Sequence, residues 1–382
     1  MAQLNEMLQK MVEIGASDLI VKVGGYPSAR VDGRVEILDK YLITSQVAQE
    51  LLKEIAPQSL QDRFLQVQEC DLSYDLPDVG RFRVNLFLQR GHVGMVFRHI
   101  KRRIPGFDEL CLPRGPLEKI AALPRGLVIV TGVAGSGKST TLAAVVEHIN
   151  EKYQKHILTI EDPIEYLYVD KKSVISQREI GPDTPGFVSA LKYCVRQSPD
   201  VILIGEMRDQ ETMSAAITAA ETGHLVLSTL HTTNAPQTVE RIISYYPVHQ
   251  HDLVRQQMSL LLKGVICQRL LPRKEGQGRV PAVEIMLATP TIRELLAEGK
   301  TRSLYTAIRE GTDYFGTQTF NQSLRKWYEA GVITLETALA ASDNPEELEL
   351  EVKGVLKGTR SKDVGSTTFI KKLPIPDSNT RK

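Results

Sequence analysis

Residues 132–139 read G-V-A-G-S-G-K-S, and this stretch decides the class of fold. It matches the phosphate-binding pattern G-x-x-x-x-G-K-[ST] at every fixed position. The apolar run at 127–130 predicts a buried parallel strand before the loop. Apolar residues at helical spacing between 140 and 149 predict a helix after it. The sequence therefore predicts strand, phosphate loop and helix in direct succession.

The chemistry of phosphate binding depends on this succession. Glycines allow backbone N–H groups to turn toward phosphate oxygens, and the helix adds the positive end of its dipole. Lys138 can reach the β- and γ-phosphates, and the hydroxyl of Ser139 can ligate Mg²⁺. We therefore expect a bound nucleoside triphosphate. The loop residues expected to hold it are Gly132, Val133, Ala134, Gly135, Ser136, Gly137, Lys138, Ser139 and Thr140.

The overall composition is that of a soluble globular protein. The chain has 382 residues, of which 42% are hydrophobic and 24% charged, and its net charge of +1 gives no overall attraction to nucleic acid or to anionic membranes. Four widely spaced cysteines predict free thiols in a reducing compartment. We see neither a signal peptide nor a membrane-spanning apolar stretch and expect a cytoplasmic protein.

The chain divides into four predicted segments. Residues 1–100 combine an amphipathic helix at 4–12 with strand-like runs, among them 70–76, 81–89 and 92–100, which predicts a small α+β domain. Residues 101–116 hold three prolines and two glycines and are expected to form an interdomain linker. Strands and helices alternate in 117–345 and give way to helices after residue 282. Residues 346–382, rich in charge and basic toward the end, are expected to form a flexible charged tail; a docking arm is an equal alternative, and the sequence does not choose between them.

Two arginines lie on one face of the predicted strand at 81–89. The alternation places Arg81 and Arg83 opposite Phe82 and Val84. Two interpretations are open. The arginines form a solvated surface, or, in a ring-shaped ATPase, they face the phosphates of a neighbouring subunit. Arg98 is a weaker candidate of the same kind.

Acidic residues follow the predicted strand at 157–160. Glu161, Asp162 and Glu165 would lie at the carboxyl end of a strand near the phosphate loop, where a carboxylate can orient water for attack on the γ-phosphate. A solvated turn is the alternative interpretation. The sequence does not choose the base among the three acids.

Two further strand ends carry candidate residues. The apolar strand at 201–204 ends in Gly205 and Glu206, which resembles a Walker B element, and Glu206 is expected to hold Mg²⁺ through water. His231 follows the strand at 225–229 and could contact the nucleotide and sense the state of the phosphates; the alternative is a structural role, which is the more usual one for a single histidine at a strand end. The eight histidines show no metal-ligand spacing.

Five motifs together resemble the secretion/type IV pilus ATPase superfamily, the GspE/PilT-like proteins. They are G-V-A-G-S-G-K-S at 132–139, T-I-E-D-P-I-E-Y at 159–166, L-I-G-E-M-R-D at 203–209, A-A-E-T-G-H at 219–224 and S-T-L-H-T-T at 228–233. The resemblance extends over about residues 5 to 345 and implies an α/β protein: an N-terminal PAS-like domain and a RecA-like P-loop ATPase domain with a helical C-terminal extension. It also implies ATP and Mg²⁺ as cofactors, a homo-hexamer, and the arginines matching Arg81 and Arg83 completing a neighbour's site.

Two departures place the chain within the superfamily. It lacks the tetracysteine module and the longer N-terminal region of the extension ATPases, which favours the retraction branch. At 291–296 it reads T-I-R-E-L-L where PilT-like proteins resemble A-I-R-N-L-I. With the basic tail, this makes the chain most similar to the PilU-like accessory retraction ATPases. Implied partners are a PilT-like ATPase and an inner-membrane pilus platform protein, at the inner face of the cytoplasmic membrane.

Three functions follow as hypotheses. The first is a pilus retraction motor in which Lys138, Ser139, Glu161 and arginines in trans hydrolyse ATP. The second is a nucleotide-binding coupling subunit that depends on a PilT-like ring and contributes little hydrolysis. The third is a nucleic-acid motor, which the near-zero net charge and the lack of a basic groove with interleaved aromatics argue against.

Overall fold

The computed structural model describes residues 2–31, 33–100, 103–275 and 278–354. These residues form two compact units. The first contains the described residues up to 103 together with 165–167, and the second contains the remainder.

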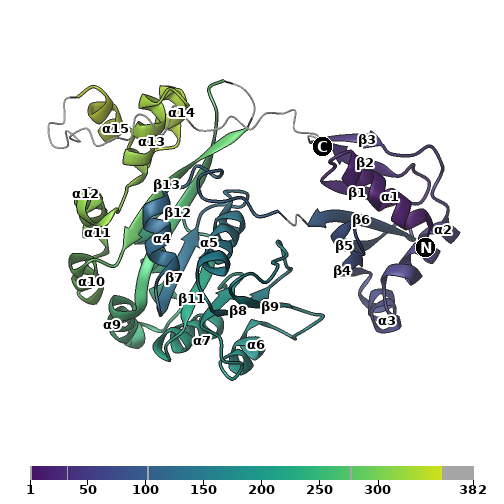
Figure 1. The fold of residues 1–382 in the computed structure, drawn as a ribbon, viewed down its shortest axis with the longest axis horizontal. Coiled ribbons are helices and arrows are strands. Elements are labelled where there is room, and N and C mark those ends of the chain that lie inside the picture. Colours follow the sequence, from purple (N-terminus) through teal and green to yellow (C-terminus); the bar gives the residue numbers. More distant parts are fainter. Residues whose placement is uncertain (1, 32, 101–102, 276–277, 355–382) are drawn as a thin grey trace. The chain divides into compact units, whose positions relative to one another are not determined.

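The N-terminal unit is an antiparallel sheet with three helices (Figure 1). Its strand order is β3-β2-β1-β6-β5-β4, and every neighbouring pair is antiparallel. The helices are α1 (Ala2–Glu13), α2 (Ser45–Ile55) and α3 (Gln58–Val67). The strands are β1 (Asp18–Lys22), β2 (Ser28–Val31), β3 (Arg34–Ile37), β4 (Glu69–Leu76), β5 (Gly80–Gln89) and β6 (His92–Ile100).

The apolar periodicity of this unit identifies its core. Leu4, Met7, Leu8 and Met11 form the buried face of α1, as their spacing predicts. In β5, Phe82, Val84 and Leu86 are fully buried, while the alternating Arg81, Arg83 and Asn85 lie on the other face. The expected small α+β domain is therefore confirmed.

The second unit is built on a seven-stranded sheet in the order β13-β12-β7-β11-β10-β8-β9. Its strands are β7 (Gly126–Thr131), β8 (His156–Glu161), β9 (Val174–Glu179), β10 (Val201–Ile204), β11 (Leu225–Leu230), β12 (Leu262–Pro272) and β13 (Arg279–Leu287). All neighbours pair in parallel except β12 and β13. The predicted parallel-sheet α/β fold is confirmed.

Helices cover both faces of this sheet (Figure 1). Those preceding the C-terminal region are α4 (Arg114–Ala121), α5 (Lys138–Lys152), α6 (Phe187–Cys194), α7 (Gln210–Glu221), α8 (Ala235–Ser244) and α9 (His251–Leu261). Apolar residues of α4 and α5 pack with Val128 and Val130 of β7. Leu127 and Ile129, which alternate with them, pack in the core that contains α7 to α9.

The antiparallel hairpin of β12 and β13 was not predicted. Residues 262–272 combine a β-branched segment with Gly264, Gln268 and Arg269, so they show neither strict alternation nor an unbroken apolar run. In β13 the edge position accommodates Pro281, which cannot donate to a ladder. The hairpin places β12 directly beside the phosphate-loop strand β7.

A helical region follows β13. It begins at Pro290 and not after residue 282 as predicted, because residues 283–287 complete β13. Its helices are α10 (Pro290–Ala297), α11 (Leu304–Glu310), α12 (Thr312–Phe315), α13 (Phe320–Glu329), α14 (Leu335–Ala340) and α15 (Pro345–Val352). Short 3₁₀ helices lie at Val248–Gln250 and Thr301–Ser303. The indole N–H of Trp327 on α13 donates to the carbonyl of Pro281 at 2.7 Å, which fixes α13 against β13.

Two predicted boundaries shift. Residues 346–352, expected in the flexible tail, belong to α15, and Leu348 is fully buried in the core. The rest of the tail, 355–382, lies outside the described residues. Within the predicted linker, 101–102 also lie outside them, while Phe107 and Leu112 are buried against the α4–α5 side of the sheet. A shorter linker is therefore expected, ending before Phe107.

The four cysteines are free thiols, and Cys70, Cys194 and Cys267 are buried. None of the helices in the described part of the chain combines the length and the apolar character required to cross a bilayer.

Candidate functional site: a phosphate loop at the carboxyl edge of the sheet

The parallel strands bring the predicted site residues to one edge of the second unit's sheet. β7, β11, β10 and β8 are consecutive neighbours and run in the same direction. Their carboxyl ends lead into the phosphate loop, His231, Glu206 and Glu161 respectively. Ligands of open parallel sheets bind at this edge.

The phosphate loop has the backbone conformation that its glycines permit. Gly132, Gly135 and Gly137 have φ values of +148°, +75° and +90°, a region that residues with a Cβ rarely adopt. The helix α5 begins at Lys138, so its first N–H groups point toward the loop. The side-chain hydroxyl of Ser136 is buried and has no hydrogen-bond partner among the residues that the structure describes. The loop thus presents donors of the kind that phosphate oxygens accept.

Lys138 lies inside the loop. Its ammonium donates to the carbonyls of Gly132 at 2.8 Å and Val133 at 3.2 Å, and the residue is 9% exposed. A buried ammonium requires anionic or carbonyl partners, because desolvation of an isolated charge is unfavourable. Ser139 and Thr140 follow in the first turn of α5 and are half-buried.

Gln268 on β12 supports the loop and was missed by the sequence analysis. Its Nε2 donates to the carbonyl of Ser136 at 2.8 Å, and its Oε1 accepts from the hydroxyl of Thr141 at 2.7 Å. A Cβ on Gly132 would lie 2.4 Å from the Gln268 carbonyl oxygen. Since its strand was not predicted, no sequence signal placed Gln268 beside a loop more than 120 residues away.

Glu161 ends β8 and is held in place by its neighbours. Its Oε1 accepts from the hydroxyl of Thr159 at 2.7 Å and from the amide of Gln177 at 3.4 Å. Only 9% of the residue is exposed, whereas Asp162 and Glu165 are exposed. Glu165 is grouped with the first unit. Of the three acids, only Glu161 is buried.

Glu206 and His231 are brought together, as their adjacent strands imply. The Nε2 of His231 lies 3.2 Å from one carboxylate oxygen of Glu206, and Arg208 pairs with the other oxygen. Gly205 lies against the end of β8, where a Cβ would be 3.5 Å from the Cα of Glu161. The two acids therefore follow neighbouring strand ends.

A chain of threonines connects the loop after β11 to the start of the phosphate loop. The hydroxyl of Thr131, the last residue of β7, accepts from the N–H of Thr232 at 2.8 Å and lies 2.7 Å from its hydroxyl. The Thr232 hydroxyl also lies 2.7 Å from that of Thr238 on α8. These buried hydrogen bonds fix residues 231–233 relative to the phosphate loop.

The candidate arginines belong to the N-terminal unit and have carboxylate neighbours there. Arg81 pairs with Asp75 at 3.2 Å, and Arg83 approaches Asp71 at 3.6 Å. Arg98 lies directly across the ladder from Arg83 and pairs with Asp18 at 2.8 Å. Their participation in a nucleotide site stays a prediction.

Comparison with known proteins identifies the family. The model of the type II/IV secretion system protein family matches residues 113–339. The chain belongs to this family. It is 42% identical to the type IV pilus ATPase PilU of Pseudomonas aeruginosa, over 92% of this chain and 91% of that protein. It is equally 42% identical to the pilus retraction ATPase PilT of the same organism, over 90% of this chain and 99% of that one.

Solved structures of secretion and pilus ATPases share the fold. The crystal structure of the pilus retraction motor PilT with bound ADP aligns at a TM-score of 0.85, with 42% identity, over 91% of this chain and 98% of that chain. The Legionella pneumophila ATPase DotB aligns at 0.77 with 28% identity, over 92% and 96%. The predicted membership of the GspE/PilT-like superfamily is confirmed.

Proposed function

We propose that the chain is an ATP-hydrolysing motor of the type IV pilus retraction machinery that supports twitching motility. The observation that carries this proposal is the geometry of the sheet edge, where a phosphate loop, two strand-end carboxylates and a histidine follow four adjacent parallel strands. Similarity to PilU and PilT over nearly the whole chain supports the pilus assignment.

The residues present fit ATP and Mg²⁺. The buried Ser136 hydroxyl and the first N–H groups of α5 provide donors for phosphate, and Lys138 provides the charge. Ser139 would ligate Mg²⁺ directly, and Glu206 would hold it through water. When bound, the metal ion neutralises phosphate charge and stabilises the transferring phosphoryl group. Similarity to a PilT structure that contains ADP supports nucleotide binding.

Glu161 is the proposed base that orients the attacking water. Its carboxylate is fixed by Thr159 and Gln177, so it can present one orientation to a water molecule at the loop. Asp162 and Glu165 remain the alternatives. His231, through Glu206, would respond to the phosphate state.

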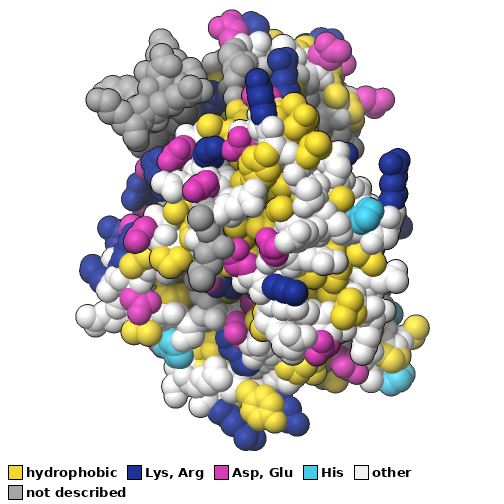
Figure 2. Space-filling model, turned by 90° about the vertical axis from the view of Figure 1, so that its right-hand side faces the viewer, with side chains coloured by type: hydrophobic (Ala, Val, Ile, Leu, Met, Phe, Trp, Pro, Cys, Tyr) yellow, Lys and Arg dark blue, Asp and Glu magenta, His cyan; other side chains and the backbone are white. Residues whose placement is uncertain are grey.

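A homo-hexamer is the proposed assembly, with Arg81 and Arg83 of one subunit completing the site of the next. An arginine supplied in trans stabilises charge that develops on the transferred phosphoryl group. A cytoplasmic location at the inner membrane face, a PilT-like partner ATPase and a pilus platform protein complete the proposal. Nucleic acid is not a proposed partner. Lys and Arg are interspersed with Asp and Glu on the face drawn in Figure 2.

Substitution of Lys138 tests the proposal. Lys138→Ala should lower ATPase turnover by about 10²–10³-fold, because it removes the charge that stabilises the transferring phosphoryl. The exposed lysine on α6 offers a matched control, and Lys192→Ala should retain wild-type turnover. Full ATPase activity in Lys138→Ala would refute the assigned site.

A second candidate function is a coupling subunit that binds nucleotide and depends on a PilT-like ring. The sequence T-I-R-E-L-L, which spans α10, motivates it. Twitching that persists with Glu161→Gln in this chain but stops when the partner ATPase is disabled would favour this candidate.

A further inference from the structure

We infer that strand β12 aligns the two loops of the ATPase site, and that Gln268 and Arg269 are positioning residues for hydrolysis. The inference rests on the proposed ATPase function. It concerns consecutive residues of one strand, whose side chains point to opposite faces of the sheet. Gln268 contacts the phosphate loop and Arg269 contacts the loop that carries His231.

Gln268 fixes the phosphate loop from the α5 side of the sheet. It is 4% exposed, and both ends of its amide are bonded, to the Ser136 carbonyl and to the Thr141 hydroxyl of α5. A Cβ on Gly137 would lie 2.8 Å from its Nε2. Gln268 therefore determines both the position of the loop backbone and the space available to it.

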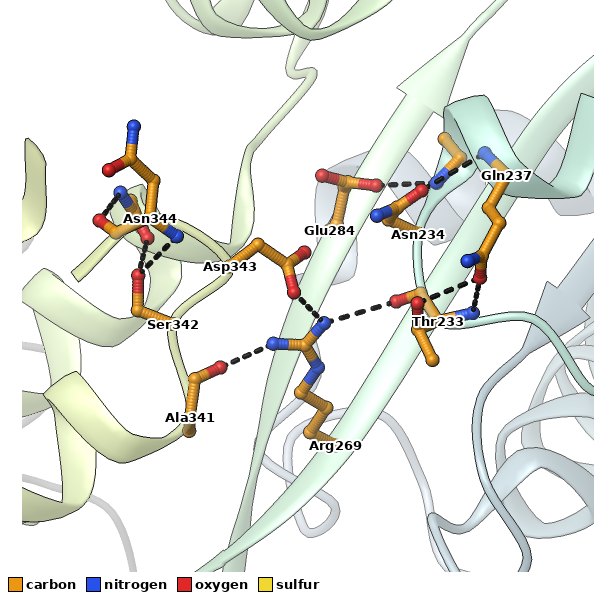
Figure 3. Close-up of polar contacts among 11 residues, drawn as sticks. Thr233, Asn234, Gln237, Arg269, Glu284, Ala341, Ser342, Asp343 and Asn344 are labelled. Atoms are coloured by element: carbon orange, nitrogen blue, oxygen red, sulfur yellow. Dashed lines mark hydrogen bonds and ion pairs between the residues drawn. The ribbon is translucent and has the colours of Figure 1, made fainter.

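On the opposite face of the sheet, Arg269 fixes the loop that carries His231 (Figure 3). Its Nη2 donates to the carbonyl of Thr233 at 3.3 Å and to Asp343 at 2.6 Å. Its Nη1 donates to the carbonyl of Ala341, and the guanidinium lies 4.0 Å from the centre of the Phe320 ring. Arginine suits this position because its planar group donates in several fixed directions at once.

The anchored loop leads directly to the site. Thr233 is two residues beyond His231, whose ring approaches Glu206 at 3.2 Å. On the opposite side of the loop, Thr232 is bonded to Thr131 at the end of β7. Residues 231–233 are thus bonded to β7 and to β12, and also to α8, where the Oε1 of Gln237 accepts from the N–H of Thr233 at 3.0 Å and from its hydroxyl at 2.8 Å. We expect loss of the Arg269 contact to let this loop, and with it His231, shift relative to the sheet.

The two contacts predict different kinetic defects. Loss of the Gln268 bonds should loosen the phosphate loop before nucleotide binds, which weakens binding. Loss of the Arg269 bond should leave the phosphate loop intact and displace His231, which slows the chemical step, since small displacements lower catalytic rates strongly. A purely structural role of these residues would instead weaken nucleotide binding and lower kcat together, in both variants.

The test compares Gln268→Met and Arg269→Met with the wild-type full-length chain. Gln268→Met should raise KM for ATP and the Kd for fluorescent mant-ADP by about tenfold with kcat nearly unchanged. Arg269→Met should lower kcat by about tenfold or more and leave both KM and Kd near wild type. Arg269→Lys, which keeps the charge and one donor direction, should recover part of the lost kcat.

Arg309 offers a matched control for loss of an ion pair in the C-terminal helices. It pairs with Glu347 at 2.7 Å, and Arg309→Met should leave kcat, KM and the mant-ADP Kd unchanged. Thermal unfolding of every variant reports the folded fraction. If Arg269→Met does not fold, Arg269→Lys takes its place and should show a smaller loss of kcat with KM and Kd near wild type; wild-type kcat in Arg269→Lys would then overturn the inference.

The inference is overturned if the two Met variants show the same kcat-to-KM pattern, or if kcat of Arg269→Met and KM of Gln268→Met stay at wild-type values. A wild-type chain that binds mant-ADP but does not hydrolyse ATP alone or with a PilT-like ring would instead refute the proposed ATPase function, and with it the role of Arg269. The two failures are therefore distinguishable.

Discussion

Glu161 and Asp162 are neighbours in the chain and have different surroundings. The Glu161 carboxylate accepts hydrogen bonds from Thr159 and Gln177 and is largely buried, whereas Asp162 is exposed. A general base must hold one orientation relative to the water that it activates. Burial and hydrogen bonding therefore favour Glu161 as the base, and neither property can be derived from the sequence alone.

This difference leads to a prediction for the paired amide variants. Glu161→Gln should lower kcat by about 10²-fold or more while preserving the Kd for mant-ATP, because the amide keeps the shape but cannot accept the proton. Asp162→Asn should stay within a few-fold of wild type. Steady-state ATPase assays and mant-ATP titration check both. The opposite ranking would transfer the role to Asp162.

A second residue-scale prediction concerns the buried Glu284 on β13. Burial raises the pKa of its carboxyl from 4.5 to about 7, although the N–H of Ala235 donates to it at 2.7 Å. The Cys267 thiol, Asp343 and Arg269 are the neighbouring titratable or charged groups. Because the folded pKa lies above the unfolded one, the folded state binds the extra proton between these values. The contribution of this group to the free energy of unfolding is fully present below pH 4.5 and is lost as the pH rises through 7.

Glu284→Gln should remove this pH dependence, since the amide oxygen can still accept from Ala235. We expect the difference in unfolding free energy between variant and wild type to shift by about 3 kcal/mol in favour of the variant from pH 5 to pH 8. Urea unfolding at several pH values measures it. A difference that stays constant with pH would contradict the assignment of the proton to Glu284.

At the scale of elements, the phosphate loop is constrained by its contact with β12. Gly132→Ala would place a Cβ 2.4 Å from the backbone carbonyl of Gln268, at a φ of +148°. Strain of about 1–3 kcal/mol in the loop should weaken mant-ADP binding by about tenfold or more. Gly186 precedes α6 as its N-cap residue and has an extended backbone; among the described residues, no heavy atom beyond its chain neighbours would lie within 4 Å of an added Cβ. Gly186→Ala should therefore bind normally, and equal affinity in both variants would exclude this constraint.

The sequence pattern predicted those elements that pack mainly against segments close to them in the chain. The strand at 127–130, the helix at 140–149 and the buried face of α1 agree with β7, α5 and α1 of the structure. The positions of Glu161, Glu206 and His231 at the ends of strands were also predicted, from the apolar runs that precede these residues. β12 did not, because Gln268 and Arg269 interrupt its apolar pattern. Gln268 is buried and Arg269 is half-buried, and both are satisfied by loops from elsewhere in the chain that bond to them. Such partners have no local sequence signature.

At the scale of the whole molecule, the proposed function has Arg81 and Arg83 of one subunit acting in trans on the site of another. Arg81 and Arg83 pair with Asp75 and Asp71 on the sheet of the N-terminal unit. The Arg81 side chain is half-buried, but the carboxylates of both pairs are exposed, and ion pairs that water reaches contribute about 1 kcal/mol or less to stability. Their substitution should therefore leave the domain folded. This allows the proposed contribution in trans to be tested without loss of structure.

Mixed oligomers provide that test. Lys138→Ala and a double Arg81→Ala, Arg83→Ala variant should each be inactive, whereas their equimolar mixture should regain about a quarter of wild-type ATPase activity, the share of interfaces with both parts intact. The matched control mixes Lys138→Ala with Glu161→Gln. Each of these changes inactivates the site of the subunit that carries it. No subunit in that mixture has an intact site, so the mixture should stay inactive. Equal activity of the two mixtures would contradict a shared site.

The position of Trp327 has a practical consequence. It is the sole tryptophan of the chain, and its indole group joins α13 to β13. Intrinsic tryptophan fluorescence therefore reports on a single contact, the packing of the C-terminal helices against the sheet that carries Arg269. Emission that shifts to longer wavelength in mild denaturant, before the far-ultraviolet dichroism changes, would reveal the helices separating ahead of the ATPase core, without any attached dye.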